Sequence, residues 1–231
     1  MKKFLTLLTG ILLLMTVSHS EKTLAQSKFL TYLALGDSYT IGEGVPEKDR
    51  YPVQLVQQLN QGGKYSFEKP QIIAKTGWTV DELDAGINAS HTDEQGYDLV
   101  TLLIGVNNQY RGRPVIDFEK DFEAMLQRAI DFARGNKNHV VVLSIPDWGI
   151  TPFAVGRNTD KAKVAQEIDA YNASKKKICD KYRIAFIDIT EDYRAIGAQP
   201  EMVVEDQLHP SELVYKRWTD KLLIEVQKIK F

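Results

Sequence analysis

A serine at position 38 lies among residue types that support nucleophilic chemistry. The mostly apolar run 29–35 stops at Gly36-Asp37-Ser38, and two further hydroxyl side chains follow. An apolar run that ends at a glycine is typical of a buried strand that leaves a sheet. Ligands bind at the carboxyl ends of strands in open α/β sheets, so Ser38 is placed where a nucleophile could be used. Gly-Asp-Ser is also ordinary turn chemistry, so the tripeptide alone does not decide between the two interpretations.

A serine hydroxyl becomes a nucleophile only when a neighbouring base takes its proton, and the chain offers four histidines for that role. His19 falls in the N-terminal apolar stretch. His91 precedes the third predicted strand and His139 opens the fourth, so both are expected at amino ends, about 17–20 Å from Ser38. His209 alone follows the last predicted strand, at the same edge of the sheet as Ser38. By elimination, we identify His209 as the base.

The base needs an acid to orient it. Asp206 precedes His209 by three residues, and a carboxylate at that spacing can curl back to accept a hydrogen bond from the imidazole Nδ1–H. Such a bond leaves Nε2 facing the serine. Pro210 restricts His209 to an extended conformation and is suited to begin a helix. Asp188 and Glu205 are competing acids, and a surface helix-capping pair is the alternative interpretation of Asp206 and His209.

An acyl-transfer site must also stabilise the negative charge of a tetrahedral intermediate. Three donors could converge here: the backbone N–H of Ser38, the backbone N–H of Gly77 and the side-chain amide of Asn107. Each follows one of the first three predicted strands, and these strands are expected to be neighbours. A glycine at 77 suits a close approach of the backbone to a ligand. Taken singly, Gly77 and Asn107 could each be simple turn residues.

The remaining chain must bring these residues to one edge. Hydrophobic patterns predict strands that alternate with helices. The strands are 29–35, 71–74, 99–104, 139–145 and 184–189, and the main helices are 50–61, 79–87, 115–134, 160–182 and a last one after 210. This alternation favours an α/β fold, a three-layer α/β/α sandwich around a five-stranded parallel sheet. Five strands suggest the order 2-1-3-4-5.

The segment after the fourth strand, which contains Trp148 and Phe153, is predicted to be an irregular loop of about 14 residues, and this length suggests a function. The segment 190–207 is also predicted to be irregular. Trp148 and Phe153 could wall an apolar acyl pocket, offer a platform on which a sugar ring stacks, or cover the core. Arg111 lies on the same edge. It could bind an anionic substrate group such as a phosphate or, as we favour, brace a loop through Asp147.

Composition limits the classes of partner. The 231 residues include 29 basic and 31 acidic ones, a net charge of −2, which gives no electrostatic footprint for nucleic acid. The run Lys175-Lys176-Lys177 is expected to form a solvated helix face. Cys179 is the only cysteine, so no internal disulfide can form, and we expect it to be buried.

The N-terminus has the three-part pattern of a secretory signal peptide. Lysines at 2 and 3 precede an apolar stretch, 4–17, of about 14 residues, which is too short to span a bilayer comfortably. Small residues offer cleavage after Ser20 or after Ala25. We therefore expect a signal peptide at 1–25, a single domain at 26–231, and a secreted or periplasmic protein without a membrane span in its mature chain. An uncleaved anchor is the alternative.

Taken together, these blocks resemble the SGNH hydrolases, also called the GDSL esterase/lipase family. The four residues of the name match Ser38, Gly77, Asn107 and His209, in the family's order. The resemblance implies a flavodoxin-like fold, no cofactor and no metal. It also implies a Ser–His–Asp triad, with Ser38 as nucleophile, His209 as base and then acid, and Asp206 as orienting acid, and an oxyanion hole formed by Ser38, Gly77 and Asn107.

Two positions depart from the family's usual motif. Asn108 replaces the aspartate that often follows the third block, and Tyr39 replaces the leucine after Gly-Asp-Ser. Neither change removes a catalytic group, but both could alter how the neighbouring loops are braced. The chain is most similar in character to secreted bacterial members described as lysophospholipase-like esterases.

The function expected from this resemblance is hydrolysis of a small-molecule, lipid or glycan ester through an acyl-enzyme. A general carboxylesterase, including lysophospholipase or thioesterase activity, is the first hypothesis, and a carbohydrate O-acetylesterase is the second. An O-acyltransferase and a non-catalytic binding module are less favoured, because a binding module has no need of Ser38, Asp206 and His209 together. The sequence does not indicate an oligomeric state.

Overall fold

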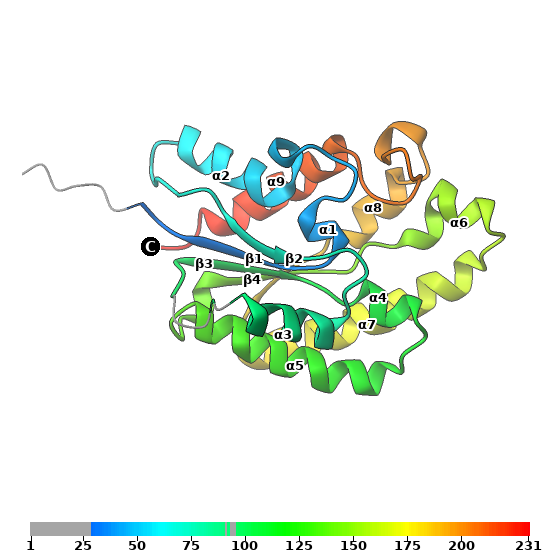
Figure 1. Ribbon diagram of the computed structural model, residues 1–231, viewed down its shortest axis with the longest axis horizontal. Helices are drawn as coiled ribbons and strands as arrows, with labels where there is room; N and C mark the ends of the chain where they lie inside the picture. The colour runs from blue at the N-terminus through cyan, green and yellow to red at the C-terminus, as the bar shows by residue number, and fades with distance from the viewer. Residues whose placement is uncertain (1–28, 91, 93–95) are drawn as a thin grey trace, which may run out of the picture.

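The computed structural model describes residues 29–90, 92 and 96–231. The signal peptide expected at 1–25, and the histidines His19 and His91, lie outside the described residues. Figure 1 shows a central sheet between two layers of helices. All strands are parallel, in the order β2-β1-β3-β4-β5. The predicted three-layer fold and its strand order are therefore confirmed.

The strands follow the apolar runs of the sequence. They are β1 (Tyr32–Gly36), β2 (Gln71–Ala74), β3 (Leu99–Leu103), β4 (Val140–Leu143) and β5 (Ala185–Ile187). Every residue of the central strands β1, β3 and β4 is buried, as expected for parallel strands that are covered on both faces. β2 and β5 lie at the two edges of the sheet and are partly exposed.

Helices cover both faces of the sheet (Figure 1). On one face α2 (Tyr51–Gln61) packs against α9 (Glu212–Val226). On the other face α5 (Val115–Phe132) packs between α3 (Val80–Ala89) and α7 (Lys161–Tyr182). Each long helix turns an apolar stripe to the sheet, which is the periodicity that the sequence predicts. Among the described residues, no helix is long and apolar enough to cross a membrane.

Short helices account for the main difference from the predicted elements. The connection after β4 is not irregular, because it forms η3 (Trp148–Ile150) and α6 (Pro152–Gly156). The segment after β5 forms α8 (Thr190–Ile196) and η4 (Pro200–Met202). Further short elements are α1 (Ser38–Ile41), η1 (Glu47–Asp49), α4 (Val106–Tyr110) and η2 (Lys137–His139). One or two turns are too short to show a helical period in sequence, so the pattern missed them.

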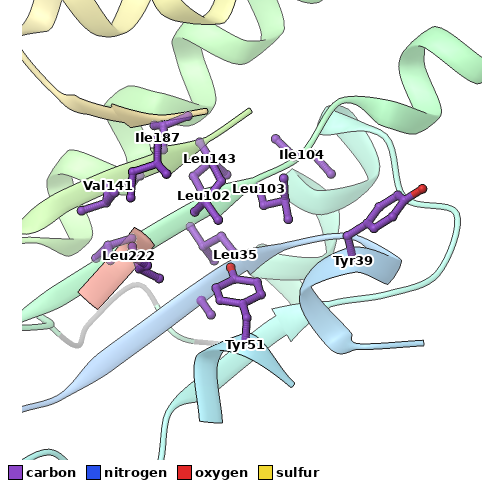
Figure 2. Packing of buried hydrophobic residues seen from close by; sticks show 14 of the residues in the cluster. Leu35, Tyr39, Tyr51, Leu102, Leu103, Ile104, Val141, Leu143, Ile187 and Leu222 are labelled. Atoms are coloured by element: carbon purple, nitrogen blue, oxygen red, sulfur yellow. The ribbon is translucent and has the colours of Figure 1, made fainter. Parts of the chain in front are cut away.

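The core extends through the sheet into both helical layers. Figure 2 shows Leu35, Leu102, Val141 and Ile187 from four strands, together with Leu222 from α9. All five side chains are buried. Burial of each large aliphatic side chain contributes about 1.5–3 kcal/mol relative to exposure, so this continuous cluster is the main source of stability.

Two leucines of α9 test whether burial in this cluster is the main source of stability. Leu222 is fully buried, whereas Leu213 is 47% exposed. Leu222→Ala should lower the free energy of unfolding by about 2–5 kcal/mol, because the side chain leaves a cavity in the core. Leu213→Ala, the matched control, should change it by less than about 0.5 kcal/mol. Urea denaturation of the two variants measures both values, and equal losses would contradict the burial pattern.

Candidate active site

Ser38 lies at the carboxyl end of β1, as the first residue of α1. The side chain of Asp37 caps this short helix by accepting a hydrogen bond from the Tyr39 N–H at 3.0 Å. A glycine before them is required by close packing: a Cβ at Gly36 would lie only 2.3 Å from the Leu103 carbonyl oxygen. Strand, glycine and helix together form a sharp turn that presents Ser38 at the edge of the sheet.

His209 and Asp206 form a hydrogen-bonded pair on the segment that precedes α9. The Asp206 Oδ2 atom is 2.5 Å from His209 Nδ1, and Asp206 Oδ1 accepts bonds from the backbone N–H groups of Leu208 and His209. Burial raises the pKa of Asp206, but these hydrogen bonds outweigh burial and leave the pKa below its ordinary value. The aspartate is thus held as a carboxylate that fixes the orientation of the imidazole.

The competing acids have other partners. Asp188 Oδ1 accepts a hydrogen bond from the Thr190 N–H at 2.8 Å, at the start of α8, and one from the Ser144 hydroxyl. Glu205 lines a separate surface depression beside Pro152 and Pro200. Asp206 is the carboxylate that contacts His209 among the three candidates.

One cavity brings the candidate residues together. It has a volume of about 180 Å³, and its polar lining residues include Ser38, Asn107 and His209. No hydrogen bond joins Ser38 Oγ to His209 among the described residues, and such contacts often tighten only when substrate binds. A larger depression of about 500 Å³, lined by His139 and Arg183, lies at the opposite end of β4 and β5. His139 therefore lies far from Ser38, as predicted from its position before β4.

The three predicted oxyanion donors lie around this cavity. The N–H groups of Ser38 and Gly77 donate to no acceptor in the described part of the chain, so both are available to a ligand. Gly77 has φ +86°, a left-handed conformation that favours glycine. One proton of the Asn107 Nδ2 group goes to the Trp78 carbonyl oxygen at 3.0 Å, which leaves the second proton for a ligand.

Side chains of the segment after β3 hold the turn after β2 in place. Arg111 Nη2 donates to the Gly77 carbonyl oxygen at 2.6 Å and also pairs with Glu82 at 3.0 Å. Glu82 in turn accepts a hydrogen bond from the Thr79 N–H at 2.9 Å and so forms a capping box at the start of α3. Arg111 thus acts on the turn and does not line the cavity. The predicted brace to Asp147 is wrong, because Asp147 pairs with Arg194 at 2.8 Å.

Asn108, which departs from the usual family motif, belongs to the same set of contacts. Its Oδ1 atom accepts a hydrogen bond from the Val80 N–H at 3.2 Å, at the first turn of α3. Its Nδ2 atom is buried and has no partner among the described residues. The asparagine therefore supplies the acceptor that the helix needs but adds a donor that nothing satisfies.

Aromatic side chains form the apolar wall of the cavity. Trp148 and Phe153 both line it, as does Tyr110. The Trp148 indole N–H donates to Gln109 Oε1 at 2.8 Å, so the ring is fixed and only 7% exposed. Tyr110, whose ring centroid is 5.1 Å from that of Trp148, is 51% exposed. Sequence reasoning did not assign Tyr110, although its place three residues after Asn107 in α4 could have indicated it.

No group of three or more His, Cys, Asp or Glu side chains gathers to hold a metal ion in residues 29–90, 92 and 96–231. The arrangement offers a serine, an oriented imidazole and unpaired N–H groups around one small cavity, which is what acyl transfer requires.

Comparisons with solved structures give the same fold. The chain is similar to the esterase EstA from Pseudoalteromonas sp., with 15% identity, a TM-score of 0.64, and coverage of 86% of this chain and 97% of that one. It is similar to a lipase/acylhydrolase from Enterococcus faecalis, with 17% identity, a TM-score of 0.64, and coverage of 87% and 96%. A third is the acetylxylan esterase Axe2 from Geobacillus stearothermophilus, with 18% identity, a TM-score of 0.65, and coverage of 85% and 94%.

Identities this low show the fold alone, and a comparison with curated protein sequences found no match. The family is shown by a sequence model. The model of the GDSL-like lipase/acylhydrolase family matches residues 34–217, a range that includes both Ser38 and His209. The chain therefore belongs to the GDSL-like lipase/acylhydrolase family, the SGNH hydrolases, and is a hydrolase that acts on esters.

Proposed function

We propose that the protein is a serine carboxylesterase that works through an acyl-enzyme on Ser38. The observation that carries the proposal is the hydrogen bond between Asp206 and His209 at the edge of the cavity that Ser38 lines. With its Nδ1 proton directed to Asp206, the imidazole keeps Nε2 as an acceptor for the serine proton. The same geometry stabilises the imidazolium once the proton has moved.

The reaction follows from these roles. Ser38 Oγ attacks the ester carbonyl carbon while His209 takes the hydroxyl proton, which gives a tetrahedral intermediate. His209 then donates this proton to the leaving alcohol, and the acyl group remains on Ser38. His209 then takes a proton from water, which attacks the carbonyl carbon of the acyl-enzyme and gives a second tetrahedral intermediate. This intermediate collapses as His209 returns the proton to Ser38 Oγ, so the carboxylic acid leaves and the serine is regenerated. In both steps the oxyanion accepts hydrogen bonds from the N–H groups of Ser38 and Gly77 and from the Asn107 amide.

The size of the cavity favours a short acyl group. About 180 Å³ is smaller than the 300–1,000 Å³ that is usual for small-molecule sites, and the indole of Trp148 is fixed by Gln109. We therefore propose short-chain esters ahead of the long-chain lysophospholipids and thioesters that the same fold could accept. A carbohydrate O-acetylesterase is the second candidate, since acetyl is a short acyl group and one similar structure is an acetylxylan esterase.

The nucleophile can be tested by covalent labelling. A fluorophosphonate probe should label the wild-type protein once, and Ser38→Ala should abolish that label because it removes the hydroxyl that His209 is proposed to activate. Peptide mass spectrometry locates the modified residue. Persistent labelling of the Ser38→Ala variant elsewhere would overturn the assignment.

The choice of acid is tested by two matched carboxylate-to-amide changes. Asp206→Asn should lower kcat by about 10³–10⁴-fold, because an amide can hold the imidazole in the wrong tautomer. Asp188→Asn is the control and should change kcat by less than about threefold, since Asp188 contacts Ser144 and the start of α8 and does not contact His209. Steady-state hydrolysis of nitrophenyl acetate measures both variants. If only Asp188→Asn inactivates the enzyme, the acid has been misassigned.

Acyl-chain preference tests the role of the aromatic wall. The wild-type protein should hydrolyse an acetyl nitrophenyl ester at least about tenfold faster than the octanoyl ester, judged by kcat/KM. Trp148→Ala opens the cavity and should raise the octanoyl-to-acetyl ratio by about tenfold. Trp78→Ala, a change near the site but outside the cavity lining, should leave the ratio unaltered. An octanoyl preference in the wild-type protein would argue against short-chain esters.

A further inference from the structure

Lys175 of α7 is buried beneath the edge of the sheet where the candidate site lies. The predicted solvated face is correct for Lys176 and Lys177 but wrong for Lys175, which has no exposed surface. A lysine is almost never fully buried unless its ammonium group has partners. The reaction proposed above does not use this side chain, so its placement needs a separate explanation.

The ammonium group joins the ends of two strands. Lys175 Nζ donates to the Ile104 carbonyl oxygen at 3.0 Å and to the Leu143 carbonyl oxygen at 2.8 Å. The β3–β4 ladder ends at the pair Leu102–Val142, so these two carbonyls belong to the residues at which the strands part. A single buried cation therefore ties together the starts of the loops that lead to Asn107 and to Trp148.

Asp37 is a buried carboxylate that interacts electrostatically with this cation. Gly36 of β1 is paired with Leu103 of β3, so the next residues, Asp37 and Ile104, lie at the same level of the sheet. Asp37 is 1% exposed and forms no ion pair shorter than 4 Å in the described part of the chain. It accepts the Tyr39 N–H and precedes Ser38, so its charge and position act directly on the turn that holds the nucleophile.

The two charges depend on each other. Burial raises the pKa of Asp37 to about 7, and the nearby Lys175 works against that rise. Burial lowers the pKa of Lys175 to about 7, while Cys179 and Asp37 work in the opposite direction. The ring of Phe122, whose centroid is 5.3 Å from Nζ, also favours the charged form of the lysine.

We propose that Lys175 is a positioning residue of the active site. Its ammonium group holds the strand ends that carry Asn107 and Trp148 and balances the Asp37 carboxylate beside Ser38. The inference rests on the proposed function, because it concerns the rate of the reaction at Ser38. In this proposal one buried ammonium group positions three of the segments around the cavity, namely those that follow β1, β3 and β4.

A double-mutant cycle in kcat tests the proposal. Lys175→Met keeps the length of the side chain without its charge, and Asp37→Asn keeps an oxygen that can accept the Tyr39 N–H. Each change alone should lower kcat for nitrophenyl acetate by about 10–100-fold and alter KM by less than about threefold, because positioning is lost while ground-state binding is kept. The double variant should be no slower than the slower single variant, since the charges are coupled.

Controls separate positioning from folding. Lys175→Arg should recover at least about a third of the wild-type kcat, because it restores the charge and the donors. Lys176→Met, an exposed neighbour paired with Asp180 at 2.7 Å, should leave kcat unchanged. All rates are divided by the fraction of sites that a fluorophosphonate labels, so that misfolded protein does not count. If Lys175→Met does not fold, Asp37→Asn alone decides, and an unchanged kcat in that variant overturns the proposal.

Other outcomes are equally decisive. A wild-type kcat in Lys175→Met, or losses that add fully in the double variant, would show that Lys175 does not position the site. Failure of the proposed function is recognised separately, by the absence of Ser38 labelling in the wild-type protein. If the wild-type protein is labelled and hydrolyses the ester normally, but the Lys175 variants do not show the expected losses, only the positioning role of Lys175 is overturned.

Discussion

The cavity depends on the hydrogen bonds that tie the turn after β2 to the segment after β3. Arg111 holds the Gly77 carbonyl, Asn107 holds the Trp78 carbonyl, and Asn108 holds the Val80 N–H. These contacts keep Gly77 in its left-handed conformation, with its N–H free of internal partners. A donor fixed before the substrate arrives stabilises the developing oxyanion without reorganisation.

The parallel sheet explains why a few local contacts are enough to assemble the site. All five strands run in one direction, so the loops that follow them share one edge. Ser38 follows β1 and Asn107 follows β3, and these two strands are directly paired. His209 reaches the same edge from the segment before α9. The fold thus places the groups around one cavity, and local hydrogen bonds set their orientation.

The fold and the composition of the site were largely predictable from sequence. Long apolar runs predicted the five strands, and the position of each histidine relative to them singled out His209. The contacts of long polar side chains were not predictable. Arg111 was expected to reach Asp147, but it contacts Gly77 and Glu82 instead. A long, flexible arginine side chain can pair with any of several acids within its reach, and sequence spacing does not distinguish these acids.

Burial of a charged group was the other feature that sequence could not reveal. Lys175 stands in a run of three lysines that has the composition of a solvated surface. Its burial depends on where β3 and β4 part, because its ammonium group donates hydrogen bonds there to the carbonyls of Ile104 and Leu143. Short helices were missed for a related reason, since capping contacts and tertiary packing, and not a repeating pattern, stabilise them.

We propose that the turn after β2 and the segment after β3 form an oxyanion hole for a reaction at Ser38. A crystal structure of the protein inhibited by a phosphonate ester would reveal whether these donors engage the reacting group. We expect phosphorus bound to Ser38 Oγ, with one phosphonyl oxygen about 2.7–3.1 Å from the Ser38 N, Gly77 N and Asn107 Nδ2 atoms. A phosphonyl oxygen directed to solvent, with Gly77 and Asn107 unengaged, would contradict it.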